Sequence, residues 1–132
     1  MKNSTYKKLD LSGRIFMSLW FGISGFFELT RNPVVWDITL KLGYPAHFIY
    51  ILGVFKILGS IIFLIPNRFN RIKEWIFAGM FFDITFAFFS KIVVLGFSST
   101  IDAIIAFVVL AITYYSFNRI HCIDYTENLY QD

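Results

Sequence analysis

Long apolar runs joined by short polar connectors constrain this chain more than any other feature of its sequence. The runs lie at about 13–29, 46–65, 73–94 and 100–117. A helix needs about 20 apolar residues to cross the hydrocarbon core of a bilayer, where an open chain would leave its backbone polar groups unsatisfied. We therefore predict an all-α membrane protein with one domain, a four-transmembrane-helix bundle, followed by a polar tail at 118–132.

The composition excludes several other classes of protein. Hydrophobic residues make up 57% of the chain and charged residues only 16%, whereas soluble domains carry about 25% charged residues. This balance rules out a disordered chain and an ordinary soluble enzyme. The net charge of +3 does not indicate a nucleic-acid partner, because the basic residues flank the apolar runs and form no stripe on a polar face.

The sequence contains no motif for a metal, a redox centre or a nucleotide. Cys122 is the one cysteine, so an intrachain disulfide and a CxxC redox pair are excluded. His47 and His121 lie far apart in the chain and match no metal-ligand spacing. No Gly-rich phosphate-binding loop occurs. We predict no catalytic residue, no metal site and no resident cofactor, although a quinone or a lipid is compatible with the sequence.

Basic residues in the connectors predict the orientation of the chain in the membrane. Eight lie in the N-terminal segment, the second connector and the C-terminal segment: Lys2, Lys7, Lys8, Arg14, Arg68, Arg71, Lys73 and Arg119. Three lie on the opposite side: Arg31, Lys41 and Lys91. Since Lys and Arg gather in cytoplasmic loops, we expect both termini in the cytoplasm. No signal-peptide cleavage site follows the first run, so we expect that run to stay in the protein.

The first connector is predicted to form a short helix of its own. Asn32 is a good N-cap, Pro33 suits the first helical position, and Gly43 suits the C-terminal end. Between them, Asp37 and Lys41 form a helical i,i+4 pair, and apolar residues recur at helical spacing. We expect an amphipathic helix between the first two spans, lying on the outer membrane interface.

Each predicted span has one narrow face of small and polar residues. Small residues let helices approach closely in a bilayer, where lipid gives no hydrophobic drive for helices to associate. We therefore expect these faces to meet inside the bundle. The candidate packing residues are Ser18, Gly22, Gly25, Gly53, Gly59, Gly79 and Ala106.

One ionisable residue lies on each of these faces. Lys56 is ten residues from either end of its span and Asp83 is ten residues into the next one, so a rise of about 1.5 Å per residue places both near mid-membrane. An isolated charge is costly at that depth, which predicts an ion pair between them. Glu28 and Asp102 lie near the outer ends of their spans. The predicted intramembrane polar site opens to the outside and contains Lys56, Asp83, Glu28, Asp102 and Tyr50.

These charged residues also have purely structural interpretations. The Lys56–Asp83 pair can fix the register of two helices without binding anything. Glu28 can be an interfacial residue beside Arg31, and Asp102 can be a first-turn acid favoured by the helix dipole. If all four charged residues of the polar site converge, three acids around one Lys favour proton handling or the binding of a cationic ligand.

Several short segments stand in an order and spacing typical of one family. They are Ser24-Gly25 with Leu29, Leu42 to Pro45, Ile51 to Gly53, Lys56 to Gly59, Leu64 to Pro66, Ile72 to Trp75, Ala78-Gly79, and Phe81 to Asp83. This pattern resembles the DoxX-like family over about residues 13–117, with Glu28 standing where that family often has a Lys. The resemblance implies a four-helix bundle in the bacterial cytoplasmic membrane. Relatives include a subunit of a thiosulfate:quinone oxidoreductase and, in animals, assembly chaperones of receptor channels.

Three functions fit these observations. We favour a non-catalytic accessory or assembly subunit that binds a partner in the membrane, either another membrane protein or a second copy of this chain in a homodimer. The alternative is a quinone-binding subunit of an oxidoreductase complex, in which Tyr50, Lys56 and Asp83 contact a quinone oxygen. The third is a small proton-coupled transporter. The intramembrane charges favour this function, but the sequence shows neither the internal repeat nor the mid-bilayer proline that is typical of transporters.

Overall fold

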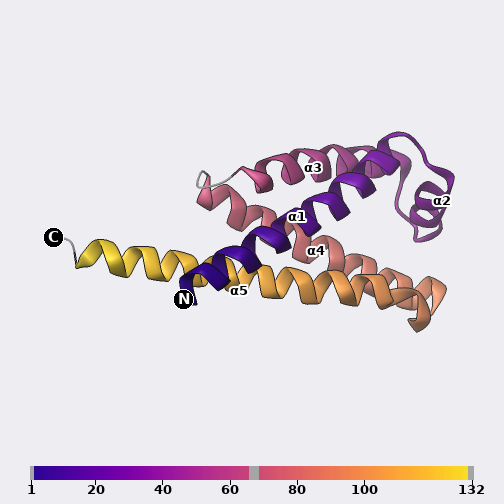
Figure 1. Cartoon of the computed structure of the whole chain (residues 1–132). Coiled ribbons are helices and arrows are strands. Elements are labelled where there is room, and N and C mark those ends of the chain that lie inside the picture. Colours follow the sequence, from indigo (N-terminus) through magenta and orange to yellow (C-terminus); the bar gives the residue numbers. More distant parts are fainter. Residues whose placement is uncertain (1, 66–68, 131–132) are drawn as a thin grey trace.

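The chain folds as a set of long helices (Figure 1). The computed structural model describes residues 2–65 and 69–130, and these ranges contain helices and no strand. This finding confirms the all-α prediction. In chain order the elements are α1 (Lys2–Leu29), α2 (Pro33–Lys41), α3 (Ala46–Leu64), α4 (Asn70–Leu95), the 3-10 turn η1 (Phe97–Thr100) and α5 (Ile101–Leu129).

Three helical segments are long and apolar enough to cross a membrane among the described residues. They are α3, α4 and the segment Phe97–Leu129, which consists of η1 and α5. Helix α1 has 28 residues but is not one of the three, because its first half is polar and its apolar half also carries Arg14 and Glu28. The chain is therefore a helical membrane protein with three spans supported by length and composition.

The short helix predicted in the first connector is present as α2. The Asn32 side chain accepts a hydrogen bond from the Val34 backbone N–H at 3.1 Å, and Pro33 occupies the first helical position. Gly43 follows the helix with a φ of +94°, a backbone conformation that glycine adopts without a steric penalty. These capping residues explain why α2 begins and ends where it does.

Helix α1 is the centre of the packing. It runs between α3 and α5 and contacts both, while α4 packs against α5 and η1. In Figure 1, α1 crosses from the end that holds both termini to the end that holds α2. Its buried side chains Met17 and Phe21 join Phe63 of α3, Phe77 of α4 and Leu110 of α5 in one core.

Close contacts at small residues bring these helices together. A Cβ atom on Gly25 would lie 2.8 Å from the Gly53 carbonyl oxygen, so α1 and α3 meet backbone to backbone. Gly22 faces the Ser60 side chain, and Ser18 and Ala106 are buried. Gly22 and Gly25 of α1 thus lie against α3, while Ser18 and Ala106 are buried in the bundle.

Two of the predicted packing glycines do not lie at such contacts. A Cβ atom on Gly79 would have no neighbour within 4 Å, and one on Gly59 would meet only the Ile76 side chain, at 3.9 Å. The prediction for Gly79 is corrected, because the face of α4 that carries it lines a cavity and touches no helix there.

A close contact between α1 and α5 was not predicted. A Cβ atom on Gly13 would lie 2.0 Å from Oγ1 and 2.9 Å from Cβ of the Thr113 side chain. We expect Gly13→Ala to destabilise the protein by about 1 kcal/mol, measured as a lower midpoint of thermal unfolding in mild detergent. Adding Thr113→Ala should recover part of the loss. An unchanged midpoint in Gly13→Ala would show that the two helices have room to separate.

The C-terminal segment differs from the expected polar tail. Helix α5 continues to Leu129 and projects beyond the other helices at the end of the chain (Figure 1). The physical reason is that no Gly or Pro follows Phe117 to end the helix. Pro66 of the family pattern and Arg68 of the basic connector lie outside the described residues, as do residues 131–132 of the tail.

Candidate functional site

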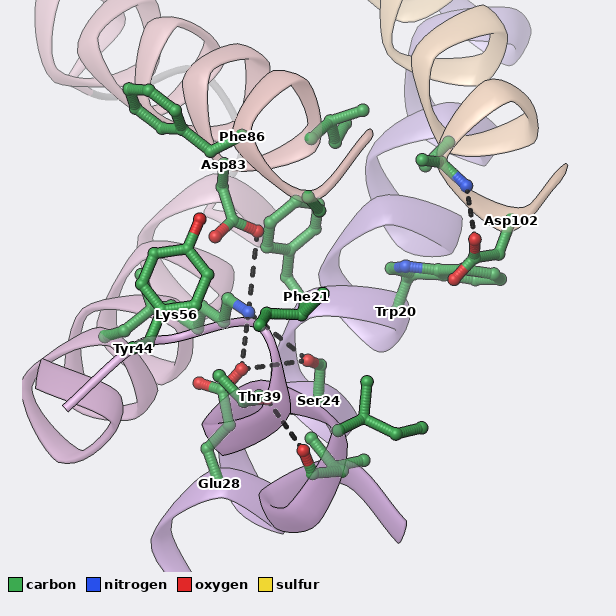
Figure 2. Close-up of a pocket in the computed structure, with 18 of the residues that line it drawn as sticks. Trp20, Phe21, Ser24, Glu28, Thr39, Tyr44, Lys56, Asp83, Phe86 and Asp102 are labelled. Carbon is green, nitrogen blue, oxygen red and sulfur yellow. Dashed lines mark hydrogen bonds and ion pairs between the residues drawn. The ribbon is translucent and has the colours of Figure 1, made fainter. Parts of the chain in front are cut away.

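An ion cluster joins three helices inside the bundle. Lys56 Nζ of α3 lies 2.7 Å from Glu28 Oε1 of α1 and 3.4 Å from Asp83 Oδ2 of α4. The Ser24 hydroxyl of α1 is 3.4 Å from the same nitrogen. Figure 2 shows Lys56 at the centre of these contacts, with the two carboxylates on different sides of it. The structure thus brings together Lys56 and Asp83, which the sequence predicted to lie at the same membrane depth. Glu28 lies closer to Lys56 than Asp83 does.

The carboxylates of this cluster differ in their surroundings. Glu28 is only 3% exposed, and its Oε2 atom is buried with no hydrogen-bond partner. The Asp83 side chain is 23% exposed. Since one Lys faces two acids, the cluster carries a formal charge of −1 when all three groups are ionised. Buried charges without a full set of partners are costly, so this cluster is energetically less favourable than a fully paired ion pair.

The cluster lies against a cavity of about 630 Å³. This volume falls in the range typical of sites for small ligands. Most of the wall is aromatic or aliphatic, and every helix from α1 to α5 contributes to it. The aromatic lining residues are Trp20, Phe21, Phe27, Tyr44, Phe48, Phe82 and Phe86.

Helix α2 covers one side of this cavity. Its apolar residues Val35, Ile38 and Leu42, the last at the C-cap, line the cavity together with Thr39. The sequence analysis gave the connector helix an interfacial position and did not foresee this contact. Its amphipathic pattern is the signal that could have suggested it, because an apolar helix face needs a surface to cover.

Asp102 lines the same cavity but is paired separately. Its carboxylate binds the Lys91 ammonium group of α4, and Figure 2 shows it well apart from the Lys56 cluster. All four charged residues of the predicted polar site therefore line one cavity. Only Glu28 and Asp83 contact Lys56, while Asp102 is neutralised by its own partner.

Tyr50 does not belong to the site, which corrects that part of the prediction. Its hydroxyl binds Arg31, and its ring lies 5.2 Å from that of Trp36. Six residues separate Tyr50 from Lys56 on α3, which at about 100° per residue puts the two side chains on different faces. The tyrosine that does line the cavity is Tyr44, whose hydroxyl lies 3.1 Å from the Ser90 hydroxyl.

A second buried charged group lies toward the end of the bundle that holds the N-terminus. Arg14 forms a 2.6 Å salt bridge with Asp10, which is only 3% exposed. Lys73 of α4 is 1% exposed and interacts electrostatically with both. The sequence analysis assigned Arg14 and Lys73 to the cytoplasmic flanks and did not predict that Lys73 is buried beside the Asp10–Arg14 pair.

Metal ligands do not gather anywhere in the part of the chain that the structure describes. No group of three or more His, Cys, Asp or Glu side chains there is arranged to hold a metal ion. The charged groups that line the cavity are two ammonium groups, Lys56 and Lys91, and three carboxylates, and a few hydroxyls lie beside them.

The helices and the buried charged cavity define the class of this protein, a helical membrane protein with a polar site in its apolar interior. More particularly, the chain belongs to the DoxX-like family, whose sequence profile matches residues 14–116. No curated protein and no solved structure matches the chain.

Proposed function

We propose that this DoxX-like protein is a non-catalytic accessory or assembly subunit that binds a small amphiphilic molecule in its intramembrane cavity. In this proposal α1 is the fourth span, because its apolar half packs along α3 and α5 between the two ends of the bundle. Both termini then face the cytoplasm, and the basic flanks favour this orientation. The membrane is the bacterial cytoplasmic membrane that the family resemblance implies.

The observation that carries the proposal is the cavity with its charged end. The cavity of about 630 Å³ is only partly enclosed by the helices, so a ligand can enter it, and its volume suits a small ligand. Here it is lined by aromatic rings and by the incompletely paired Glu28. Ligand sites combine apolar walls with a few fixed polar groups in this way.

A quinone-binding subunit of an oxidoreductase complex is the second candidate. Flat aromatic head groups suit the walls of the cavity, which Trp20, Phe21, Phe82 and Phe86 line. Lys56 and Tyr44 line the cavity and would be the donors to a quinone carbonyl oxygen, in place of the Tyr50 that the sequence suggested. An electron donor would have to be supplied by another subunit.

Native mass spectrometry of the protein in mild detergent tests the binding proposal. We expect a retained small molecule and a homodimer. Gly79→Phe, which fills the cavity from a position with free space around it, should release the molecule and leave the dimer. Val93→Phe, at a site on α4 that is 83% exposed and outside the cavity, is the matched control and should retain it. A protein that carries no adduct, or an adduct that Gly79→Phe does not displace, would contradict the proposal.

A further inference from the structure

We infer that the cavity selects an amphiphile with a positively charged, hydrogen-donating head group, such as a primary ammonium on an alkyl chain. The head group would bind the Glu28 carboxylate, which lines the cavity, and the apolar tail would lie against the aromatic wall. This inference rests on the proposed function, since it names the ligand class of the same cavity. Three independent properties of the site lead to it.

The first property is the charge of the site. Asp102 is neutralised by Lys91, and Lys56 can neutralise only one of its two carboxylate partners, Glu28 and Asp83. The site therefore has one unbalanced negative charge in an apolar surrounding. A charge of this kind is costly inside a membrane protein unless it is paired. A ligand with one positive charge would make the site neutral, whereas an anionic ligand would double the imbalance.

The second property is the balance of hydrogen-bond donors and acceptors. An ammonium group has three donors, and Lys56 Nζ already has three partners: Glu28 Oε1, Ser24 Oγ and Asp83 Oδ2. The Tyr44 hydroxyl pairs with Ser90. On the acceptor side, Glu28 Oε2 is buried and has no partner. The free capacity of the site is thus an acceptor, which a head group with N–H donors can use and an acceptor-only carbonyl cannot.

The third property is the wall next to the ion cluster. Lys56 Nζ lies 5.7 Å from the centre of the Phe21 ring, so an aromatic face already stabilises a cation here. Trp20, Phe27, Phe82 and Phe86 extend this wall through the cavity. Aromatic rings suit both an ammonium group and the first carbons of an alkyl chain.

Trp20 fluorescence tests the inference, because Trp20 lines the cavity. A variant with Trp36→Phe and Trp75→Phe leaves it as the single tryptophan. The protein in nanodiscs is titrated with decylamine, decanol and decanoate at pH 7, which share one tail and differ in head group. Empty nanodiscs give the correction for partitioning. We expect decylamine to bind about tenfold or more tightly than either of the other two probes, as charge-assisted hydrogen bonds predict.

Glu28→Gln locates the head group. This substitution keeps the shape of the side chain but removes its charge, and it should weaken decylamine about tenfold while changing decanol by less than about twofold. Glu74→Gln removes an exposed carboxylate of α4 outside the cavity and should change neither. If Glu28→Gln does not fold, the ranking of the three probes on the unaltered protein decides the question.

The outcomes separate the inference from the proposed function. Equal binding of decylamine and decanol would mean that a proton on a carboxyl already balances the site, and it would overturn the inference while the cavity remains a binding site. Tightest binding of decanoate would also overturn it. If none of the probes changes Trp20 fluorescence and Gly79→Phe has no effect on retained molecules, the proposed function itself fails.

Discussion

Replacing Lys56 by Met is expected to lower the free energy of unfolding by about 3–5 kcal/mol, the usual cost of removing one partner from a buried ion pair. Methionine keeps the length and apolar stem of the side chain, so the main loss is the charge. Glu28 at 3% exposure and Asp83 would then face each other without a cation. Unfolding by SDS in mixed micelles, followed by tryptophan fluorescence, measures the change.

Lys91→Met is the matched control for this experiment. It removes the same side chain from another acid pair, but the partner Asp102 side chain is 46% exposed. Ion pairs of this kind contribute only about 0–1 kcal/mol, because water and counterions screen the charge that remains. If Lys56→Met and Lys91→Met destabilise the protein equally, Lys56 does not hold the cluster.

Neutralising the whole cluster separates charge from packing. Glu28→Gln and Asp83→Asn, added to Lys56→Met, remove both carboxylates that lost their cation. Buried ion clusters replaced by uncharged groups of similar volume are often neutral in stability, so we expect most of the loss to be regained. The triple variant should nevertheless bind decylamine no more tightly than decanol. A stable variant without this preference would show that the cluster is kept for its ligand and not for the fold.

The sequence predicted the helices and the contact between Lys56 and Asp83 because both depend only on where residues lie along the chain and how deep this places them in the membrane. Apolar runs fix where helices lie, and a constant rise per residue fixes the depth of Lys56 and Asp83. Capping residues fixed α2 in the same local way, through Asn32 and Pro33. These properties need no knowledge of which helices are neighbours.

The predictions that were wrong or missing depend on how each helix is rotated about its axis and on which helices are neighbours. Tyr50 was placed on the same face of its span as Lys56, although its side chain lies on another side of α3 and its hydroxyl binds Arg31. Gly79 was placed in a contact, although its face of α4 lines the cavity. Gly13 and the buried Asp10 were missed because α1 lies between α3 and α5, an order that a single sequence does not reveal.

The α1–α3 contact yields the second large prediction, which is that Gly25→Ala destabilises the protein by about 3 kcal/mol. The new Cβ would lie 2.8 Å from the Gly53 carbonyl oxygen and 2.9 Å from Lys56 Cβ. A backbone oxygen cannot rotate away as a side chain can, so the two helices must separate. Separation would also draw Lys56 from Glu28 and weaken the ion cluster. The free energy of unfolding in mixed micelles measures the loss.

Gly79→Ala is the control, and we expect it to raise the free energy of unfolding. The substitution is chemically identical and also lies within a long helix, but its Cβ would meet no atom within 4 Å. The higher helix propensity of alanine then acts alone and should stabilise α4 by up to about 1 kcal/mol. Because the propensity gain is common to both variants, the difference between them isolates the contact at Gly25. If both variants are stabilised, α1 and α3 are not held at backbone contact, and the ion cluster between them must tolerate a wider spacing.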